Sequence, residues 1–358
     1  MNGMADYAYT NARIRAMQGR LFDRAGYESL LAQTTLMDAL DALKRSPYAA
    51  ALERTDEKER VKPGTETWYR LDEALRQDLV LSLSKLRRIT SDRARDLLGL
   101  LLLRWDAYNL KTVLRGKRAH APTEEVLAST LPVGWLDEVA LAELTRVTTL
   151  RATADTLETW RSPLAHPFRE GLRAVGESDD LQLLEFALDR FAFARAFRVV
   201  AEDGDNDRVV RDYLRLLVDK ANFLTALRYL YERSALSPVE AGRHFLEANG
   251  RFTRAHYDAV AGARDVRHAM ALLADTPIRR LAGTFPEGDA PSLPRIERTL
   301  DRALLHAAVG LSRSDPLGIG VAVAYVEQKV NEVRNLRMIL RGKASGMGAE
   351  IIREWLIV

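Results

Sequence analysis

Apolar residues recur along this chain with the spacing of amphipathic helices. Leucine occupies every fourth position from Leu71 to Leu83, and Ile14, Met17 and Leu21 follow one another at intervals of three and four positions. This spacing places apolar side chains on one face of an α-helix. Runs of alternating apolar and polar residues between turn-forming residues, which would predict strands, do not occur. The pattern therefore predicts an all-α fold.

The same periodicity predicts where several of these helices lie. We expect helices over residues 7–21, 27–43, 71–86, 97–114 and 326–343. Each of these stretches carries apolar residues at helical spacing and is long enough for two turns or more.

The last of these helices contains a phrase that occurs three times in the chain. It consists of an acid, an asparagine three positions later and an apolar residue directly after the asparagine. A leucine and an arginine follow, at the fifth and sixth positions after the asparagine. The three copies are Asp106, Asn109, Leu110, Leu114 and Arg115; Asp219, Asn222, Phe223, Leu227 and Arg228; and Glu332, Asn335, Leu336, Leu340 and Arg341. The interval from the first acid to the second equals the interval from the second to the third. A phrase repeated at a fixed period predicts three copies of one structural unit.

A Leu-Asp dipeptide repeats in the same order as the phrase. It occurs at Leu71-Asp72, Leu188-Asp189 and Leu300-Asp301, at nearly the same interval as the phrase. We therefore expect an N-terminal helix over residues 1–22, followed by three homologous helical-bundle repeats. The predicted boundaries place these repeats at residues 23–137, 138–252 and 253–358.

A helical wheel places the acid of each phrase among buried residues. With the asparagine at the origin and about 100° per residue, the apolar positions of the phrase lie between about 40° and about 140°. The acid lies within this stripe, at about 60°, and the asparagine lies at its edge. The arginine lies at about 240° and points away from the core.

A buried carboxylate needs hydrogen-bond donors, because an unpaired charge in low dielectric is costly. We expect the asparagine one turn later to supply its NH₂ group, and an arginine of a neighbouring helix to add further donors. A proton-relay or metal-binding carboxylate is the functional alternative, but one acid per repeat forms no cluster of ligands. The structural interpretation, a polar joint that fixes helix register, is favoured for Asp106, Asn109, Asp219, Asn222, Glu332 and Asn335.

The outward arginines are the candidate contacts to partner proteins. They are Arg115, Arg228 and Arg341, and two of them precede a Gly-Lys pair, at 116–117 and 342–343. The simpler structural interpretation is a cation near the negative end of a helix dipole, with glycine ending the helix. The middle copy lacks the Gly-Lys pair.

Composition excludes several classes of function. The chain has 358 residues, with 53 Lys and Arg against 50 Asp and Glu, so its net charge of +3 gives no reason to expect a nucleic-acid partner. It has no cysteine, its six histidines have no metal-binding spacing, and its Gly-Lys pairs lack the other residues of a phosphate loop. We expect no catalytic, cofactor-binding or metal-binding residue.

The sequence contains no apolar run that could cross a membrane. The longest candidates are residues 97–103 and 317–326, well short of the ~20 residues required. The N-terminal stretch lacks the apolar segment of a signal peptide. We therefore expect a soluble protein that meets a membrane only through a partner.

Two stretches together resemble one protein family. Tyr7-x-Tyr9 with Arg13-x-Arg15, and the terminal phrase from Glu332 to Lys343, are similar to the C subunit of the archaeal and bacterial A-type or V-type ATPase (ATP synthase). The eukaryotic counterpart in this family is the d subunit of the vacuolar ATPase.

The resemblance implies three similar helical bundles arranged about a pseudo-threefold axis as a funnel. It further implies a non-catalytic, cofactor-free rotor subunit on the cytoplasmic side of the membrane, peripheral to it, within a large ATPase complex. Its partners would be the central-stalk subunits D and F and the proteolipid ring of the membrane rotor, between which it would transmit torque for ATP-linked proton or sodium transport. A helical-repeat scaffold that binds other proteins is the alternative, although solenoid repeats are mostly shorter, about 30–50 residues.

Overall fold

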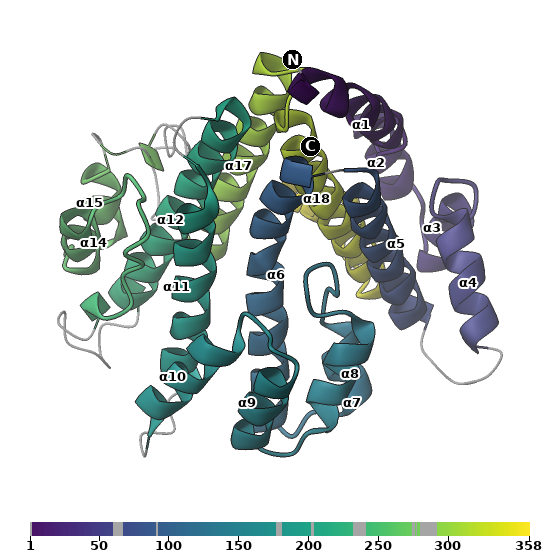
Figure 1. Ribbon diagram of the computed structural model, residues 1–358. Coiled ribbons are helices and arrows are strands. Elements are labelled where there is room, and N and C mark those ends of the chain that lie inside the picture. The colour runs from purple at the N-terminus through teal and green to yellow at the C-terminus, as the bar shows by residue number, and fades with distance from the viewer. Residues whose placement is uncertain are drawn as a thin grey trace. The chain divides into compact units, whose positions relative to one another are not determined.

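The computed structural model describes most of the chain. The described residues are 2–59, 67–90, 92–176, 181–201, 204–231, 241–273, 276, 278–279 and 292–358. Over these residues the regular structure is entirely α-helical, without a strand (Figure 1). The prediction of an all-α fold is confirmed.

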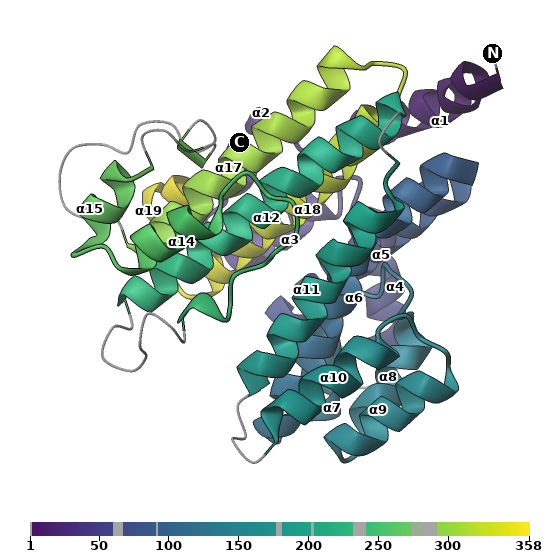
Figure 2. The same ribbon diagram turned by 60° about the vertical axis from the view of Figure 1, so that its left-hand side comes forward.

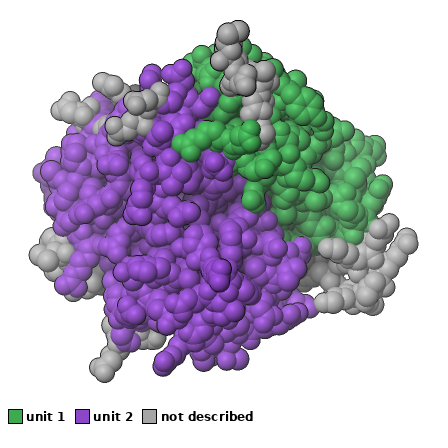
Figure 3. All heavy atoms as spheres, viewed as in Figure 1, with its two compact units in different colours: residues 1–95, 309–358 green, residues 96–308 purple. Residues whose placement is uncertain are grey.

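The chain divides into two compact units, coloured separately in Figure 3. Unit 1 joins both ends of the chain, residues 1–95 and 309–358, and unit 2 comprises residues 96–308. Two long helices contribute residues to both units, α6 (Asp92–Arg118) and α17 (Leu293–Ser314).

Unit 1 is built around its C-terminal long helix, α18 (Gly320–Ala344). The other helices of this unit are α1 (Asn2–Gln18), α2 (Arg24–Leu31), α3 (Leu36–Leu43), α4 (Ala49–Glu59), α5 (Thr67–Ile89) and α19 (Ala349–Trp355). α18 packs against α5 and α1, and also contacts α2, α3 and α19 (Figure 1). All residues from Gly320 to Val326 are buried, which explains why the beginning of α18 contains no charged residue.

The N-terminal helix is tied to the rest of unit 1 by side chains of its buried face. Thr10 donates a hydrogen bond to the carbonyl of Ile89 at 2.9 Å, and Asn11 donates one to the carbonyl of Gly318 at 3.0 Å. Ile14 is fully buried on the same face, as its spacing predicted. These contacts hold α1 against the end of α5 and the beginning of α18.

The region expected to form one helix over residues 27–43 forms two, α2 and α3, so that prediction is wrong. Thr35 and Asp38 make a capping box at the start of α3, in which each side chain binds the backbone N–H of the other. A capping box stabilises the beginning of a helix. It therefore starts a new helix at Leu36 despite the continuous apolar stripe.

Unit 2 contains two of the three phrase helices, α6 and α12 (Asp205–Tyr231). Its other helices are α7 (Thr123–Ala128), α8 (Glu138–Arg146), α9 (Leu150–Thr159), α10 (Ala165–Val175), α11 (Leu181–Val199), α14 (Arg254–Ala261), α15 (Val266–Ala271) and α17. Figure 2 shows α7–α10 grouped with α6 and α11, and α14 and α15 beside α12. Separate apolar cores fill these two groups.

The apolar residues of the phrase enter these cores as the helical wheel predicted. Leu110 and Leu114 belong to the first core, and Phe223 and Leu227 to the second. All four side chains are fully buried. The phrase therefore supplies apolar residues to the core around each of these two helices.

Candidate functional site

The asparagine of each phrase binds the backbone of one residue beyond the end of its helix. The side-chain NH₂ donates to the carbonyl of that residue, and the side-chain oxygen accepts its N–H. The pairs are Asn109 with Leu131 (2.7 and 2.8 Å), Asn222 with Leu246 (3.1 and 2.7 Å) and Asn335 with Ile357 (2.8 and 3.1 Å). Each asparagine amide thus satisfies both the N–H and the C=O of one backbone residue.

The acid of each phrase accepts backbone N–H groups from a second segment. Asp106 accepts from Trp135 at 2.8 Å and from Leu136 at 2.9 Å, and Asp219 accepts from Phe252 at 2.7 Å. These acids are 1% and 0% exposed, so the bonds offset part of the cost of removing the carboxylates from water.

Glu332, the third acid, finds its backbone donor at the other end of the chain. It is 1% exposed and accepts the N–H of Phe22 at 3.0 Å. Phe22, Leu136 and Phe252 each directly precede the N-cap of a short helix, namely α2, α8 and α14. We call each acid and asparagine, with the backbone they bind, a clamp. Clamp 1 contains Asp106 and Asn109, clamp 2 contains Asp219 and Asn222, and clamp 3 contains Glu332 and Asn335.

The expected donors to the acids were wrong in one respect. The NH₂ of each asparagine points to a backbone carbonyl and not to the acid that precedes it in the phrase. Buried backbone N–H and C=O groups must also be satisfied, and the irregular segments after the long helices have no partners within a helix. The acid and the asparagine therefore serve the backbone rather than one another.

Two glycines make room for the acids of the first two clamps. A Cβ atom on Gly134 would overlap the carboxylate of Asp106, and one on Gly250 would overlap Oδ1 of Asp219. Glycine allows another group to approach the backbone this closely. The position of Gly134 shortly before the N-cap was visible in the sequence, but its contact with an acid was not.

Clamp 3 contains a buried charge network that the sequence did not reveal. Lys329 is 5% exposed, and its Nζ lies 2.9 Å from Glu332, 2.7 Å from Asp78 and 2.9 Å from the hydroxyl of Tyr48. The hydroxyl of Tyr48 also donates to Glu332. Burial lowers the pKa of Lys329, but the two carboxylates more than offset this effect and keep it above its ordinary value. The lysine is therefore a buried cation held between two anions.

The aspartates of the Leu-Asp dipeptides make ion pairs with the phrase helices. Lys111 Nζ lies 2.7 Å from Asp189 in unit 2, where Lys220 also pairs with Asp301. In unit 1, Nε of Arg337 lies 2.7 Å from Asp72. Each phrase helix thus pairs with the next dipeptide along the chain, except that the last helix pairs with the first dipeptide.

The three candidate contact arginines are exposed, as the wheel predicted, but their surroundings differ. Arg115, with 67% of its side chain exposed, donates to Glu185 at 2.7 Å. Arg341 lies 3.8 Å from Asp72. Arg228 makes no ion pair with any residue in the described part of the chain. Only this arginine of the three presents an uncompensated charge.

The structural interpretation of the Gly-Lys pairs is confirmed for the cations, which lie in the last turn of α6 and α18, and is wrong for the glycines, which do not end these helices. α6 continues to Arg118 and α18 to Ala344, past both glycines. Val126 packs against Gly116, and Ile352 packs against Gly342, where a Cβ atom would overlap them. The lysines donate to backbone carbonyls in the last turn of a short helix and just beyond it, Lys117 to Thr145 (3.3 Å) and Val147 at the end of α8, and Lys343 to Leu31 (3.1 Å) and Gln33 at the end of α2.

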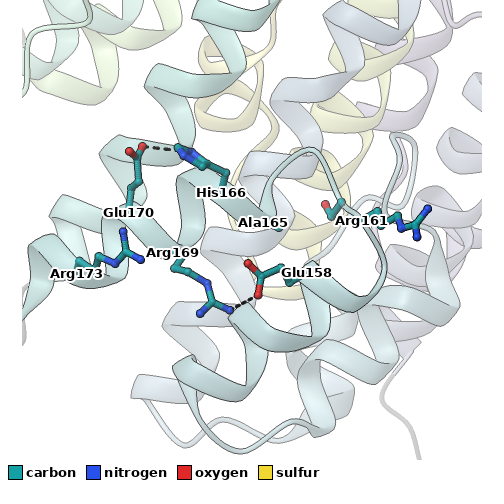
Figure 4. Close-up of a pocket in the computed structure, with 8 residues that line it drawn as sticks. Glu158, Arg161, Ala165, His166, Arg169, Glu170 and Arg173 are labelled. Carbon is teal, nitrogen blue, oxygen red and sulfur yellow. Dashed lines mark hydrogen bonds and ion pairs between the residues drawn. The ribbon is translucent and has the colours of Figure 1, made fainter.

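A hollow of about 470 Å³ opens between the end of α9 and α10 in unit 2 (Figure 4). Arg169 donates to Asp155 at 2.9 Å and also to Glu158, and His166 lies 3.5 Å from Glu170. These internal pairs compensate most of its charge. The hollow offers no nucleophile activated by a base, and the arrangement in Figure 4 is that of a solvated charged surface.

Neither a metal-binding cluster nor a membrane-spanning helix occurs among the described residues. They contain no group of three or more His, Asp or Glu side chains placed to hold a metal ion. Within the same part of the chain, no helix combines the length and the apolar character needed to span a bilayer.

These features define a helical protein built on one recurring polar joint. Comparison with known proteins gives the family: the family model of the ATP synthase (C/AC39) subunit matches residues 10–355, and the chain belongs to this family. The resemblance inferred from the terminal phrase is thereby confirmed.

Individual relatives are similar over nearly the whole chain. The C subunit of the V-type ATP synthase of Thermus thermophilus is 30% identical over 356 residues, covering 98% of each protein. Its A-type counterpart in Methanosarcina mazei is 27% identical over 358 residues, covering 99% of this chain and 94% of the relative. The A-type counterpart in Methanocaldococcus jannaschii is 25% identical over 357 residues, covering 99% and 87%. The alternative of an unrelated helical scaffold has no support in these comparisons.

Proposed function

We propose that this protein is the non-catalytic central-rotor subunit of a V-type or A-type ATPase. In this role it couples the central-stalk subunits D and F to the proteolipid ring of the membrane rotor, and transmits torque between them for ATP-linked proton or sodium transport. The observation that carries the proposal is the family match over residues 10–355.

The clamps supply a physical reason for such a role. A part that transmits torque must resist twisting, and irregular segments are the most deformable parts of a helical protein. In each clamp an irregular segment is hydrogen-bonded to a long helix through two buried side chains. Fixing these segments stiffens the connections through which a load would pass from one helix to the next.

The proposal includes the arrangement that the resemblance implies. The repeats, placed at residues 23–137, 138–252 and 253–358 after an N-terminal segment of residues 1–22, would surround a pseudo-threefold axis as a funnel. Arg115, Arg228 and Arg341 are the proposed contacts to the stalk or the ring. The protein would lie on the cytoplasmic side of the membrane and hold no cofactor of its own.

A coupling experiment tests this proposal. The complex is purified through a tag on a subunit of its soluble head, so that this chain stays unmodified, and is reconstituted into vesicles. With this chain present, ATP hydrolysis should drive ion uptake. Without it, we expect the head to hydrolyse ATP while ion uptake is lost. Full ion uptake in its absence would overturn the proposal.

A further inference from the structure

A small polar pocket lies within unit 1, where the end of α1 meets α5 and α18. These three helices contact one another, and Figure 1 shows them packed together. The pocket has a volume of about 90 Å³. Most of its lining is polar or charged, namely Arg20, Asp78, Ser82, Lys85, Tyr325 and Lys329.

The floor of the pocket is a buried network of polar side chains. Tyr325 and Lys329 are 2% and 5% exposed. The hydroxyl of Tyr325 is hydrogen-bonded to Ser82, and Nζ of Lys329 lies 2.7 Å from Asp78. These bonds fix the polar groups in place, so a ligand would meet a wall that needs little rearrangement.

The buried lysine of this network is particular to one copy of the repeated phrase. Three positions before the acid of the phrase, the chain has Lys329 in the third copy but Leu103 and Leu216 in the first and second. Replacing a buried ion pair by apolar residues of similar volume often leaves stability unchanged. Since two copies fold with leucine at this position, the fold of the repeat does not by itself require the network.

Two cations at the pocket have no side-chain partner. Within the part of the chain that the structure describes, neither Arg20 nor Lys85 makes an ion pair or a side-chain hydrogen bond. Arg20 is exposed, whereas Lys85 is half-buried. Lys85 has therefore lost part of its hydration without gaining an anion in exchange, and a charge in this position favours an anion from outside the chain.

The pocket as a whole carries positive charge. Three cations line it, Arg20, Lys85 and Lys329, against one carboxylate, that of Asp78. Lys329 is held by Asp78 and by Glu332, which does not line the pocket. Even when Glu332 is counted, one positive charge remains uncompensated. The lysine contributes to the field in the pocket, while Arg20 and Lys85 have donors free for a ligand.

The size of the pocket and its donors select the kind of anion. A volume of about 90 Å³ holds a few water molecules or one small ion and is far below the about 300 Å³ at which sites for organic cofactors begin. Arg20, Lys85 and Ser82 offer a guanidinium, an ammonium and a hydroxyl group. A phosphate group has enough oxygen atoms to accept from all three, and both cations are common phosphate ligands.

We propose that the pocket between α1, α5 and α18 binds a phosphate group, with Arg20 and Lys85 as its cationic ligands and the hydroxyl of Ser82 as a third donor. Inorganic phosphate and the phosphate of an anionic lipid headgroup both offer this chemistry. The site lies within unit 1 and does not depend on the proposed function.

Binding of inorganic phosphate to the full-length protein tests the inference. Calorimetric titration at constant ionic strength, with chloride as the competing anion, should show saturable binding to wild type. Arg20→Gln and Lys85→Gln should each raise Kd about tenfold, because each removes a charge-assisted hydrogen bond. Arg88→Gln is the matched control. Arg88 is an exposed cation of α5 that does not line the pocket, so its loss should change Kd less than about twofold.

Vesicles distinguish the two sources of the phosphate group. Co-sedimentation of the protein with phosphatidylcholine vesicles is compared with and without phosphatidic acid. Binding to free phosphate or to the acidic vesicles that is weakened by both pocket variants and not by Arg88→Gln supports the inference, and the tighter ligand identifies the source.

Three results would overturn this inference. Wild type could bind neither free phosphate nor the acidic vesicles, or Arg20→Gln and Lys85→Gln could leave binding unchanged. Alternatively, Arg88→Gln could weaken binding as much as the pocket variants, which would show only a general effect of surface charge. Neither Arg20 nor Lys85 is buried, and melting temperatures equal to that of wild type establish that the variants are folded.

Discussion

Asp72 and Arg337 form an ion pair across unit 1, with 2.7 Å between Oδ1 and Nε, although 265 residues separate them in the chain. The equivalent pair of the first phrase, Lys111 with Asp189, spans only 78 residues. The last phrase helix therefore takes from the N-terminal part of the chain the partner that the first phrase helix finds downstream. The N–H of Phe22 completes clamp 3 in the same way. The two ends of the chain are thus held in one unit by the contacts that recur within unit 2.

The clamps should differ in how much stability their asparagines contribute. Asn109→Ala removes both hydrogen bonds of Leu131 and leaves a buried N–H and a buried C=O without partners. We expect a loss of about 2–5 kcal/mol in the free energy of unfolding. Asn335 also hydrogen-bonds the buried hydroxyl of Tyr27, so this position is tested in a Tyr27→Phe background. There Asn335→Ala should cost less, about 1–3 kcal/mol, because Asn331 also donates to the carbonyl of Ile357, at 2.8 Å. Urea unfolding followed by circular dichroism measures both.

The control for this pair is Asn331→Ala, which removes one of the two donors to Ile357. The remaining donor, Asn335, keeps the carbonyl satisfied, so the loss should stay below about 1 kcal/mol. Equal losses for Asn109→Ala and for Asn335→Ala in the Tyr27→Phe background would contradict this account of the clamps.

Gly134→Ala should disrupt clamp 1 without removing any polar group. The added methyl would overlap the carboxylate of Asp106 and displace it from the N–H groups of Trp135 and Leu136. We expect a loss of about 1–3 kcal/mol, the usual cost of an inserted methyl group in a packed site. The measurement is again the free energy of unfolding in urea.

The chain offers a matched control in Gly99, which lies within α6 and has open space where a Cβ atom would be. Gly99→Ala should stabilise the protein, because alanine is favoured over glycine within a helix by about 1 kcal/mol. If both substitutions changed stability in the same direction, close approach to Asp106 would not be the reason for glycine at position 134.

The sequence predicted those parts of the fold that depend on local periodicity. The repeated phrase marked α6, α12 and α18, and the helical wheel placed Asp106, Asp219 and Glu332 among buried residues, as the structure has them. It could not predict the groups that satisfy these acids. Backbone N–H groups have no side-chain signature, and every residue except proline carries one.

Contacts between distant parts of the chain were also beyond the sequence. Tyr48 and Asp78 meet Lys329 only because the N-terminal helices pack on α18. Neither residue belongs to a repeated pattern, so counting intervals could not connect them.

The buried cation of clamp 3 should be essential to unit 1. Lys329→Met removes a positive charge from between Asp78 and Glu332 and leaves the buried carboxylate of Glu332 and the partly buried carboxylate of Asp78 without their cation. Breaking a buried ion pair by removing one partner typically costs about 3–5 kcal/mol, and we expect a loss in this range from urea unfolding.

A second substitution separates this effect from simple loss of packing. Adding Glu332→Gln to Lys329→Met removes one of the stranded charges, so the double variant should be more stable than Lys329→Met alone. If the stability lost in the double variant equalled the sum of the losses from Lys329→Met and from Glu332→Gln alone, the lysine would act through its hydrocarbon chain and not through its charge.

Stability should depend on pH through Asp219 in a direction opposite to that of most carboxylates. Burial raises the pKa of Asp219, and the hydrogen bonds from Phe252 and Arg251 offset this only in part. The folded state then holds the proton more tightly than the unfolded state. The free energy of unfolding therefore rises as the pH falls through the folded pKa of Asp219, and this gain is complete below the unfolded pKa of about 3.9. Stability from this group is lost again as the pH rises through the folded pKa.

Other carboxylates contribute to stability with the opposite pH dependence, and their contributions must be subtracted. Hydrogen bonds lower the pKa of Asp38 and Asp265, so their contribution is lost as the pH falls. The measured quantity is therefore the difference in unfolding free energy between wild type and Asp219→Asn, from pH 7 down to pH 4. The free energy of unfolding of wild type should rise relative to that of Asp219→Asn as the pH falls. A flat difference for Asp219→Asn would show that burial does not penalise this carboxylate.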